Sequence, residues 1–388
     1  MLIHSLKINN LLSFGPDAEA VELKPLNVII GPNGSGKSNF LEGISLLKSA
    51  PRELTIPIQE GGGIRDWLWK GSDQTPVAAL EAVIDNPQKK DIGLRYHIAF
   101  TESAQRLQIT DEHIENEKPY VNYSSPYFYY RYEHNHPVLN VKGTHRELKR
   151  EDVNPEQSIL SQRKDPDQYP EITYLGEVLG KIRLYREWSF GRYTSPRLPQ
   201  KPDLPNDFLD EEGRNLGLML NRLRREVTVK NQFLKYVSAL FEGIDDFDVQ
   251  IEGGSVQVFL QEGKIVVPAT RLSDGTLRYL CLLTVLCHPN PPPLVCIEEP
   301  ELGLHPDVLP TLAELLQEAS HNTQILVTTH SDVLVDALSD TPDAVLVCEK
   351  HDGSTTLRRL DREALSIWLE KYALGELWRM GEIGGKRW

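Results

Sequence analysis

One octapeptide constrains the fold of this chain more than any other part of it: Gly31-Pro32-Asn33-Gly34-Ser35-Gly36-Lys37-Ser38. It follows a short apolar run, residues 26–30, and precedes a helical pattern that starts near Ser38. A glycine-rich turn between a strand and a helix lets successive backbone N–H groups converge on a phosphate at the positive end of the helix dipole. The sequence therefore predicts a phosphate-binding loop of the G-x-x-x-x-G-K-[ST] type.

The positions of this motif suggest ATP as the ligand and Mg²⁺ as the cofactor. Lys37 is expected to reach the β- and γ-phosphates, and the Ser38 hydroxyl is expected to bind Mg²⁺. The alternative, a purely structural glycine turn, is disfavoured because the complete motif stands where its mechanism requires, after an apolar strand and at the start of a helix. The other residues expected to contact the nucleotide are Gly31, Pro32, Asn33, Gly34, Ser35, Gly36 and Asn39.

Two later strand ends carry groups that suit nucleotide hydrolysis. Residues 294–297 are apolar and run into Glu298 and Glu299. Glu298 is expected on the Mg²⁺ side, whereas Glu299 is expected to polarise the attacking water. Residues 324–329 predict a strand that ends at His330, a candidate sensor of the γ-phosphate. Lys37, Glu299 and His330 are thus the catalytic candidates; a solvated acidic strand end is the alternative for the two carboxylates.

A fourth segment, Arg271-Leu272-Ser273-Asp274-Gly275-Thr276, stands immediately before a predicted helix. Its simplest interpretation is a helix start capped by Ser273. Its position between the phosphate loop and the acidic strand end also fits an ABC signature, which contacts a γ-phosphate held by another subunit. The four segments together predict an ABC-type ATPase head.

The segments IIGPNGSGKSN, RLSDGT, CIEEPELGLHP and ILVTTHS resemble those of the RecF/SMC/OLD-related ATPases, in particular the compact, AAA_21-like prokaryotic group. This resemblance implies that Ser273, Asp274 and Gly275 contact ATP bound by a second copy, in an ATP-sandwich dimer. It also implies a role as a switch in DNA repair or antiviral defence. The chain departs from the usual pattern in having Glu298 rather than Asp, and neither Gln59 nor Gln74 is a convincing glutamine-loop residue.

The order of predicted elements indicates a discontinuous α/β head with a parallel or mixed sheet. The last third alternates helix and strand (helices 274–288, 307–319 and 332–338; strands 294–298, 323–328 and 343–348), which is typical of a parallel sheet. Residues 101–213 lack strong helical periodicity and are rich in Tyr and Pro. The expected division is 1–100 (head, first part), 101–213 (insert), 214–262 (helical and strand lobe) and 263–388 (head, second part, and tail).

Relatives in the OLD branch carry a Toprim nuclease domain, and SMC proteins carry a long coiled coil. After His330 the sequence has no paired-acid D-x-D pattern, and the insert has no heptads. A separately encoded nuclease or effector is therefore an expected partner. Two other functions stay open: a nucleotide-sensing scaffold that does not hydrolyse ATP, and the nucleotide-binding subunit of a transporter.

Charge and cysteine content restrict the partners and the compartment. With 42 Lys and Arg against 56 Asp and Glu, the net charge of −14 argues against sequence-blind coating of DNA by the whole surface. Residues 178–235 hold 12 basic and 7 acidic side chains, so a local DNA contact competes with a solvated face there. Four cysteines without a CxxC pair suggest buried thiols, and with no signal peptide or membrane span we expect a cytoplasmic protein without membrane partners.

Three weaker patterns have structural explanations that compete with functional ones. The aromatic run 120–132 predicts a half-buried strand, with base stacking on single strands as the alternative. Residues 134–136 (His-Asn-His) predict a surface turn rather than a metal site. The tail 374–388, with two Trp and four Gly, either packs on the head or docks a partner.

Overall fold

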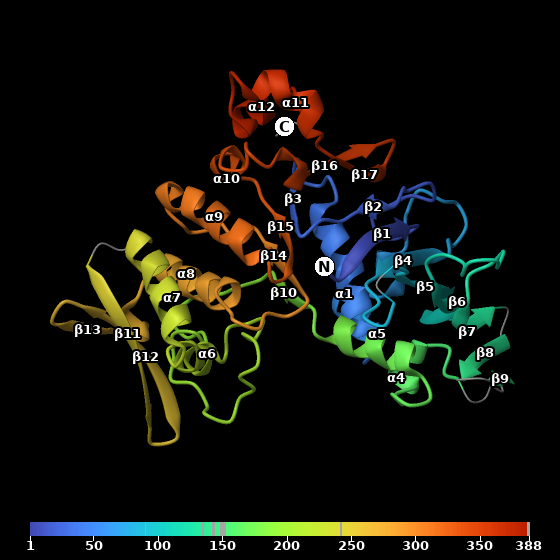
Figure 1. Ribbon diagram of the computed structural model, residues 1–388, viewed down its shortest axis with the longest axis horizontal. Coiled ribbons are helices and arrows are strands. Elements are labelled where there is room, and N and C mark those ends of the chain that lie inside the picture. The colour runs from blue at the N-terminus through green and yellow to red at the C-terminus, as the bar shows by residue number, and fades with distance from the viewer. Residues whose placement is uncertain (90, 134–135, 142–143, 148–152, 241–242, 386–388) are drawn as a thin grey trace.

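A six-stranded sheet lies at the centre of the molecule (Figure 1). The computed structural model describes residues 1–388 except 90, 134–135, 142–143, 148–152, 241–242 and 386–388. The strand order is β10-β14-β15-β3-β16-β17, and neighbours are parallel except for the antiparallel pair β16–β17. The strands are β3 (Leu26–Ile30), β10 (Arg183–Tyr185), β14 (Leu294–Glu298), β15 (Gln324–Thr328), β16 (Val345–His351) and β17 (Ser354–Arg359).

The alternation of helix and strand in the last third confirms the predicted parallel sheet. The crossover helices are α8 (Asp274–Leu286), α9 (Leu309–Ala319) and α10 (Asp332–Asp336). The carboxyl ends of β3, β14 and β15 therefore lie at one edge of the sheet, where α/β proteins place their ligands.

The two faces of this sheet belong to different hydrophobic cores. Val28 and Ile30 of β3 pack with α8 and α9, whereas Ile29 packs with Phe40 and Ile44 of α1 (Lys37–Ser49). Successive strand residues point to opposite faces, so both faces of β3 must be apolar. All five residues of β3 are buried, which fixes the loop that follows it.

An eight-stranded antiparallel sheet covers the other side of α1. Its order is β2-β1-β4-β5-β6-β7-β8-β9. The strands are β1 (Ile3–Asn9), β2 (Val21–Glu22), β4 (Ala78–Ile84), β5 (Leu94–Ser103), β6 (Arg106–Asn116), β7 (Phe128–Glu133), β8 (His136–Val141) and β9 (Thr144–Glu147). The short helices α2 (Thr55–Glu60) and α3 (Ile64–Trp67) precede β4.

The segment 101–213, expected as an insert, is distributed over three places. Its first part forms β6–β9, which continue the sheet of β1, β4 and β5, and residue 100 lies inside β5. Its middle forms α4 (Ile159–Gln162) and α5 (Pro170–Gly180), and its last part supplies β10 to the central sheet. Pairing between strands, rather than local composition, determines which part of the fold each of these residues joins. The division of the chain into four domains stays a prediction.

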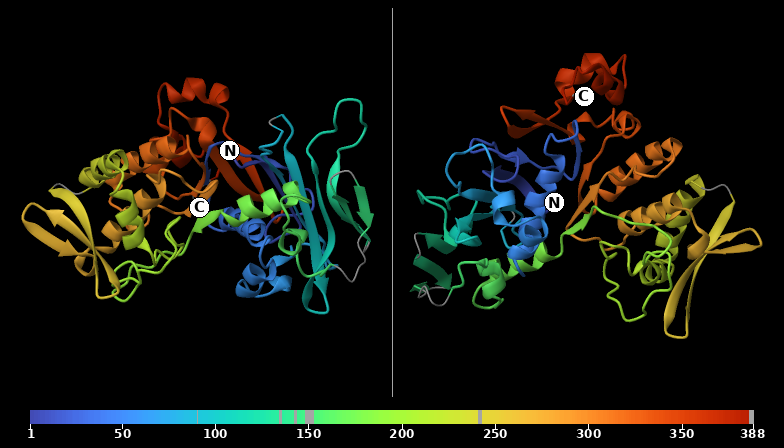
Figure 2. Two further views of the ribbon diagram at one scale, coloured as in Figure 1. Left: turned by 60° about the horizontal axis from the view of Figure 1, so that its bottom comes forward. Right: turned by 180° about the vertical axis from the view of Figure 1, so that it is seen from behind.

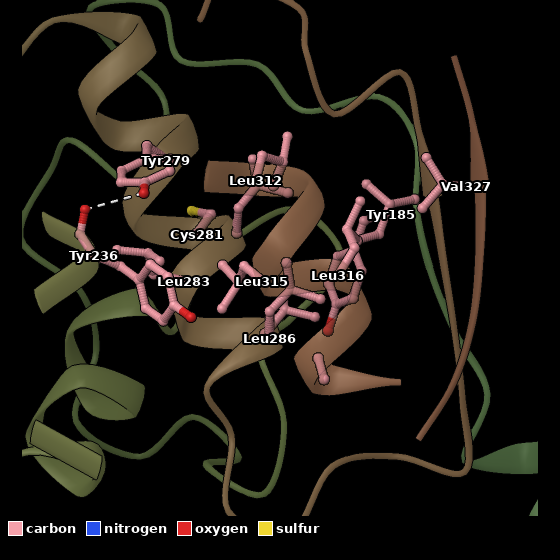
Figure 3. Packing of buried hydrophobic residues seen from close by; sticks show 14 of the residues in the cluster. Tyr185, Tyr236, Tyr279, Cys281, Leu283, Leu286, Leu312, Leu315, Leu316 and Val327 are labelled. Atoms are coloured by element: carbon pink, nitrogen blue, oxygen red, sulfur yellow. Dashed lines mark hydrogen bonds between the residues drawn. The ribbon is translucent and has the colours of Figure 1, made fainter. Parts of the chain in front are cut away.

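The residues expected to form a lobe, 214–262, contain α6 (Leu216–Leu223), α7 (Val227–Leu240), β11 (Ile244–Glu252) and β12 (Ser255–Glu262). The next strand, β13 (Ile265–Pro268), lies beyond the expected boundary and pairs with β12 in the same sheet. Figure 3 shows how this lobe packs: the Tyr279 hydroxyl of α8 donates to the Tyr236 carbonyl of α7 at 3.0 Å, while Leu283 and Leu286 meet the leucines of α9. Figure 2 shows this lobe at the opposite end of the molecule from β5–β9.

The C-terminal segment packs on the head through α12 (Leu374–Met380), which follows α11 (Arg362–Leu369). Trp378 is 1% exposed, and its Nε1 donates to the Gly385 carbonyl at 2.6 Å. Of the two interpretations of the tail, the described residues support packing. No helix in the described part of the chain is long and apolar enough to cross a membrane.

Candidate functional site

The predicted phosphate loop connects β3 to α1 at the carboxyl edge of the central sheet. Gly36 is the N-cap of α1 with φ 112°, and a Cβ there would lie 2.2 Å from Thr355 Oγ1. A Cβ on Gly31 would lie 2.2 Å from the Cys348 carbonyl oxygen. Only glycine fits these two positions, because β16 and β17 press against the loop from behind.

Lys37 is the first residue of α1, and its side chain reaches back to this loop. Its Nζ donates to the carbonyls of Gly31 (2.9 Å) and Pro32 (3.0 Å). Burial lowers the pKa of Lys37, although the carboxylates of Glu298 and Glu299 favour its charge. A buried cation whose hydrogen-bond acceptors are carbonyl oxygens suits an anionic ligand that completes its neutralisation.

Ser38 and Glu298 meet at the same edge, from α1 and from the end of β14. The Ser38 hydroxyl donates to Glu298 Oε1. Arg186, which follows β10, donates through Nε to Glu298 Oε2 at 2.9 Å, and its Nη1 lies 2.8 Å from Glu42 Oε1. Burial disfavours the Arg186 charge, but these hydrogen bonds outweigh it and raise the pKa of the guanidinium. Sequence reasoning missed Arg186 and Glu42.

Glu299 and His330 follow the neighbouring strands β14 and β15. Glu299 has a left-handed backbone (φ 46°), and its N–H donates to the Thr328 carbonyl at 3.0 Å. Its Oε1 lies 3.6 Å from His330 Nε2. The structure thus brings these two predicted residues together at the carboxyl edge. The unusual backbone turns Glu299 out of the line of the strand.

Glu301 is a further acidic residue that the sequence analysis did not select. Its Oε1 accepts hydrogen bonds from the His330 N–H (2.8 Å) and from Thr329 Oγ1 (2.6 Å). Burial raises the pKa of Glu301. The Glu-Glu-Pro-Glu sequence was a signal for it, because only two residues separate Glu301 from Glu298. Glu301 holds the backbone that presents His330.

The three signature candidates lie together at the start of α8. Ser273 caps the helix by accepting from the Thr276 N–H at 3.1 Å, and Asp274 Oδ1 lies 2.5 Å from Arg197 Nη2. A Cβ on Gly275 would lie 2.5 Å from the Gly303 carbonyl oxygen. The signature segment therefore contacts the loop that follows Glu298 and Glu299, while its own hydrogen bonds in the described residues do not reach the phosphate loop.

The glutamine candidates Gln59 and Gln74 are both exposed. Neither glutamine is the residue that contacts Glu298 from the edge strand. That residue is Arg186, which follows β10. The strand β10 that positions it is only three residues long. Three residues are too few to show the alternation of apolar and polar side chains that identifies a strand in a sequence.

The basic segment 178–235 contributes to a pocket of about 890 Å³ that also takes residues from α1. Lys181, Arg183 and Arg222 line it, but so do Asp210 and Glu211. Three basic side chains of the segment have acidic partners: Arg214 with Asp210, Arg222 with Asp207 and Arg224 with Asp248. Glu211, which also lines the pocket, is paired with Lys48 of α1. The pocket is therefore mixed in charge.

The weaker patterns are mostly structural. The strand predicted over residues 120–132 forms only from Phe128, where β7 begins; its Tyr130 and Tyr132 are buried. Residues 120–127 form no strand, and Tyr123 and Tyr127 are exposed there. All four cysteines are free and buried. His134 and Asn135 lie outside the described residues, so the expected turn there stays a prediction; His136 begins β8.

The fold and the geometry of the loop define a P-loop ATPase head of the ABC type. Residues 26–336 match the model of the family described as "AAA domain, putative AbiEii toxin, Type IV TA system", and the chain belongs to this family. The sequence matches no curated protein.

Solved SMC heads share the fold at low sequence identity. One is a Smc head domain with an extended coiled coil from Pyrococcus furiosus, bound to the C-terminal domain of ScpA (14% identity, TM-score 0.59, covering 95% of this chain and 98% of that one). Another is an SmcHead bound to the C-winged helix domain of ScpA (16%, TM-score 0.58, 93% and 99%). A third is a Smc head with a coiled coil and joint from Pyrococcus yayanosii (12%, TM-score 0.52, 95% and 99%).

Proposed function

We propose that this protein binds and hydrolyses ATP in a site built on the 31–38 loop. The observation that carries the proposal is the convergence of Lys37, Ser38, Glu298, Glu299 and His330 at one edge of the sheet. The loop N–H groups and the Lys37 ammonium would hold the β- and γ-phosphates. The matched ABC-type fold supports this assignment.

The base would lie in the pocket beside the loop. This pocket has a volume of about 450 Å³ and is lined by Ser13, Asn39 and the half-buried Trp69. Asn39 Nδ2 donates to Ser13 Oγ at 2.8 Å, which ties the pocket wall to the first turn of α1. The aromatic ring of Trp69 in this wall would suit stacking of a purine.

Ser38 and Glu298 fit Mg²⁺, because a hydroxyl and a carboxylate in direct contact are the hard oxygen ligands that this ion prefers. The ion would supply charge neutralisation at the phosphate oxygens. To admit it, Ser38 would give up its hydrogen bond to Glu298. Arg186 would then keep the second carboxylate oxygen and hold Glu298 in place.

Glu299 would act on the attacking water. Its carboxylate lies 3.6 Å from the His330 imidazole, so the two side chains can hold one water or γ-phosphate oxygen between them. Glu299 would accept the proton of the water, and His330 would donate a hydrogen bond to the γ-phosphate. Glu301 positions His330 by accepting its backbone N–H.

Ser273, Asp274 and Gly275 would complete the site of a second copy. Within one copy, Ser273 bonds to Thr276 and Asp274 bonds to Arg197. The carbonyls of the phosphate loop bond to Lys37 of the same copy. A two-fold pairing would set each signature segment against the partner's γ-phosphate and create two equivalent sites. ATP would close this sandwich and hydrolysis would open it, as befits a switch.

The Glu299→Gln variant tests this function. Gln keeps the size of the side chain but cannot take the water proton, so ATP with Mg²⁺ should accumulate a dimer by light scattering while phosphate release stops. Glu363→Gln, at an exposed position of α11, is the matched control and should behave as wild type. A Glu299→Gln variant that stays monomeric with ATP would refute the sandwich.

The output of the switch is proposed to be a DNA or effector partner in repair or defence. The basic residues of 178–235 support a DNA contact, although the pocket that they line is mixed in charge. Neutralising Arg222, Arg224 and Arg225 should then weaken DNA binding and reduce its salt dependence. The scaffold alternative predicts no phosphate release at all, and the transporter alternative predicts a membrane-protein partner.

A further inference from the structure

A row of four titratable side chains crosses the eight-stranded sheet on the face that points away from α1. Glu81 (β4), His97 (β5), His113 (β6) and Arg131 (β7) are successive cross-strand partners. The neighbours of His97 along β5, Tyr96 and Ile98, belong to the core that includes α1, so the row lies on the opposite face. Alternation thus gathers imidazole and carboxylate groups on one surface.

Asp111 joins this row because its cross-strand partner on β5 is small. That partner is Ala99, which leaves room for the carboxylate to reach the two imidazoles; its partner on β7 is Glu133. Asp111 Oδ2 lies 3.8 Å from His97 Nε2, and Oδ1 lies 3.5 Å from His113 Nδ1. The two rings are stacked, with centroids 4.5 Å apart and planes within 11°.

This geometry matches the ligand spacing of a transition-metal site. One ligand atom from each of His97, Asp111 and His113 lies within 4.8 Å of the others. A tetrahedral ion with bonds of about 2.0–2.1 Å needs ligand atoms about 3.3 Å apart. The two distances from Asp111 to the imidazoles exceed this spacing by a few tenths of an ångström. The near-parallel histidine rings would tilt on binding so that both nitrogen lone pairs point at the ion. The two histidine side chains are 18% and 19% exposed, which shields the site but leaves an approach from solvent.

The surrounding groups support the same set of ligands. His97 Nδ1 is buried with no hydrogen-bond partner among the described residues, and Glu81 Oε2 lies 3.7 Å from it. A carboxylate behind a metal-binding imidazole is the usual way to fix its tautomer and orientation. The nearby cation Arg95 has Glu115 as a partner at 3.0 Å and lies 3.6 Å from Glu81 Oε1, the oxygen that does not face His97. Arg131 lies 3.6 Å from Glu115.

We infer that His97, Asp111 and His113 form a binding site for one divalent transition-metal ion of the Zn²⁺ class, with Glu81 supporting His97 and water as the fourth ligand. Imidazole nitrogens select Zn²⁺ or Co²⁺ over Mg²⁺, which prefers oxygen donors. The site lies on β5 and β6, apart from the ATP site, and it does not depend on the proposed function.

Titration of metal-free, nucleotide-free protein with Co²⁺ tests this inference. We expect one equivalent to bind with the visible absorption of a low-coordinate Co²⁺–imidazole site, to resist excess Mg²⁺ and to be displaced by Zn²⁺. The His113→Gln and Asp111→Asn variants should lose this absorption. Glu81→Gln should weaken binding roughly 10–100-fold, as outer carboxylates do elsewhere.

The matched control is His351→Gln, since among the described residues His351 is paired only with Glu349, at 3.8 Å. It should bind Co²⁺ as wild type does. Circular dichroism of each variant separates loss of ligand from loss of fold. A wild-type protein that takes up no Co²⁺, or a folded His113→Gln variant that binds it unchanged, would overturn the site.

Discussion

Arg186 holds Glu298 from the edge strand of the central sheet: its Nε donates to Glu298 Oε2 at 2.9 Å. The same guanidinium reaches Glu42 on α1 at 2.8 Å, and Ser38 holds the other oxygen of Glu298. Three segments far apart in the sequence therefore meet at one carboxylate. These contacts position the acidic residue that is proposed to bind Mg²⁺.

Replacing this arginine by glutamine should destabilise the nucleotide-free protein. The Arg186→Gln variant leaves two partly buried carboxylates without their cation, which we expect to lower the free energy of unfolding by about 1–3 kcal/mol. Arg214→Gln is the matched control, because Arg214 makes a more exposed pair with Asp210 at 2.9 Å. There the loss should stay below about 1 kcal/mol. Equal losses in urea denaturation would contradict the role given to Arg186.

The buried carboxyl of Glu112 should make stability depend on pH. Burial raises the pKa of Glu112 to about 7, although Ser158, the Ile159 N–H and Tyr96 donate to it. The folded pKa exceeds the unfolded value of about 4.5, so its stabilising contribution is complete below pH 4.5 and is lost as the pH rises through 7. Glu112→Gln should flatten this part of the profile.

Denaturation curves between pH 4.5 and 8 measure this effect as the difference between variant and wild type. The Glu363→Gln protein, altered at an exposed residue of α11, should keep the wild-type slope. If Glu112→Gln and wild type change in parallel over this range, Glu112 does not titrate there.

The packed tail should contribute to stability through Trp378. Its ring is 1% exposed, so Trp378→Ala should cost about 3–5 kcal/mol. Trp368 on α11 is 45% exposed, and Trp368→Ala should cost less than about 1 kcal/mol. Thermal melts of the two variants compare them directly. A Trp378→Ala protein as stable as wild type would favour partner docking over packing as the role of this tail.

Sequence reasoning located the site residues near strand ends, because each short motif includes its own strand end or helix start. Lys37 begins α1, Glu298 ends β14 and His330 stands two residues after β15. Arg186 escaped it because β10 is identified only by its pairing with β14, more than a hundred residues away. No local pattern encodes such a pairing.

The middle of the chain was harder to predict for two physical reasons. β6 carries Asp111 and His113 on its outer face and the buried Glu112 on its inner face, so polar residues interrupt the alternation that marks a strand. In α5 the proline that suggests a break, Pro170, stands at the first turn, where proline starts a helix. In this part of the chain, contacts with distant residues determine the strands and helices, and local composition does not predict them.

The central claim is that one copy's phosphate loop and another copy's signature form each ATP site, and mixing two inactive variants tests it most directly. Lys37→Ala removes the phosphate ligand. Ser273→Asp keeps the cap on α8, since Asp caps helices as well as Ser, but sets a negative charge against the γ-phosphate.

Each variant alone should release no phosphate. In an equimolar mixture half of the dimers pair one chain of each kind, and each mixed dimer has one intact site of two, so activity should return to about a quarter of wild type. A mixture as inactive as its components, or a Ser273→Asp protein that hydrolyses ATP by itself, would contradict a shared site.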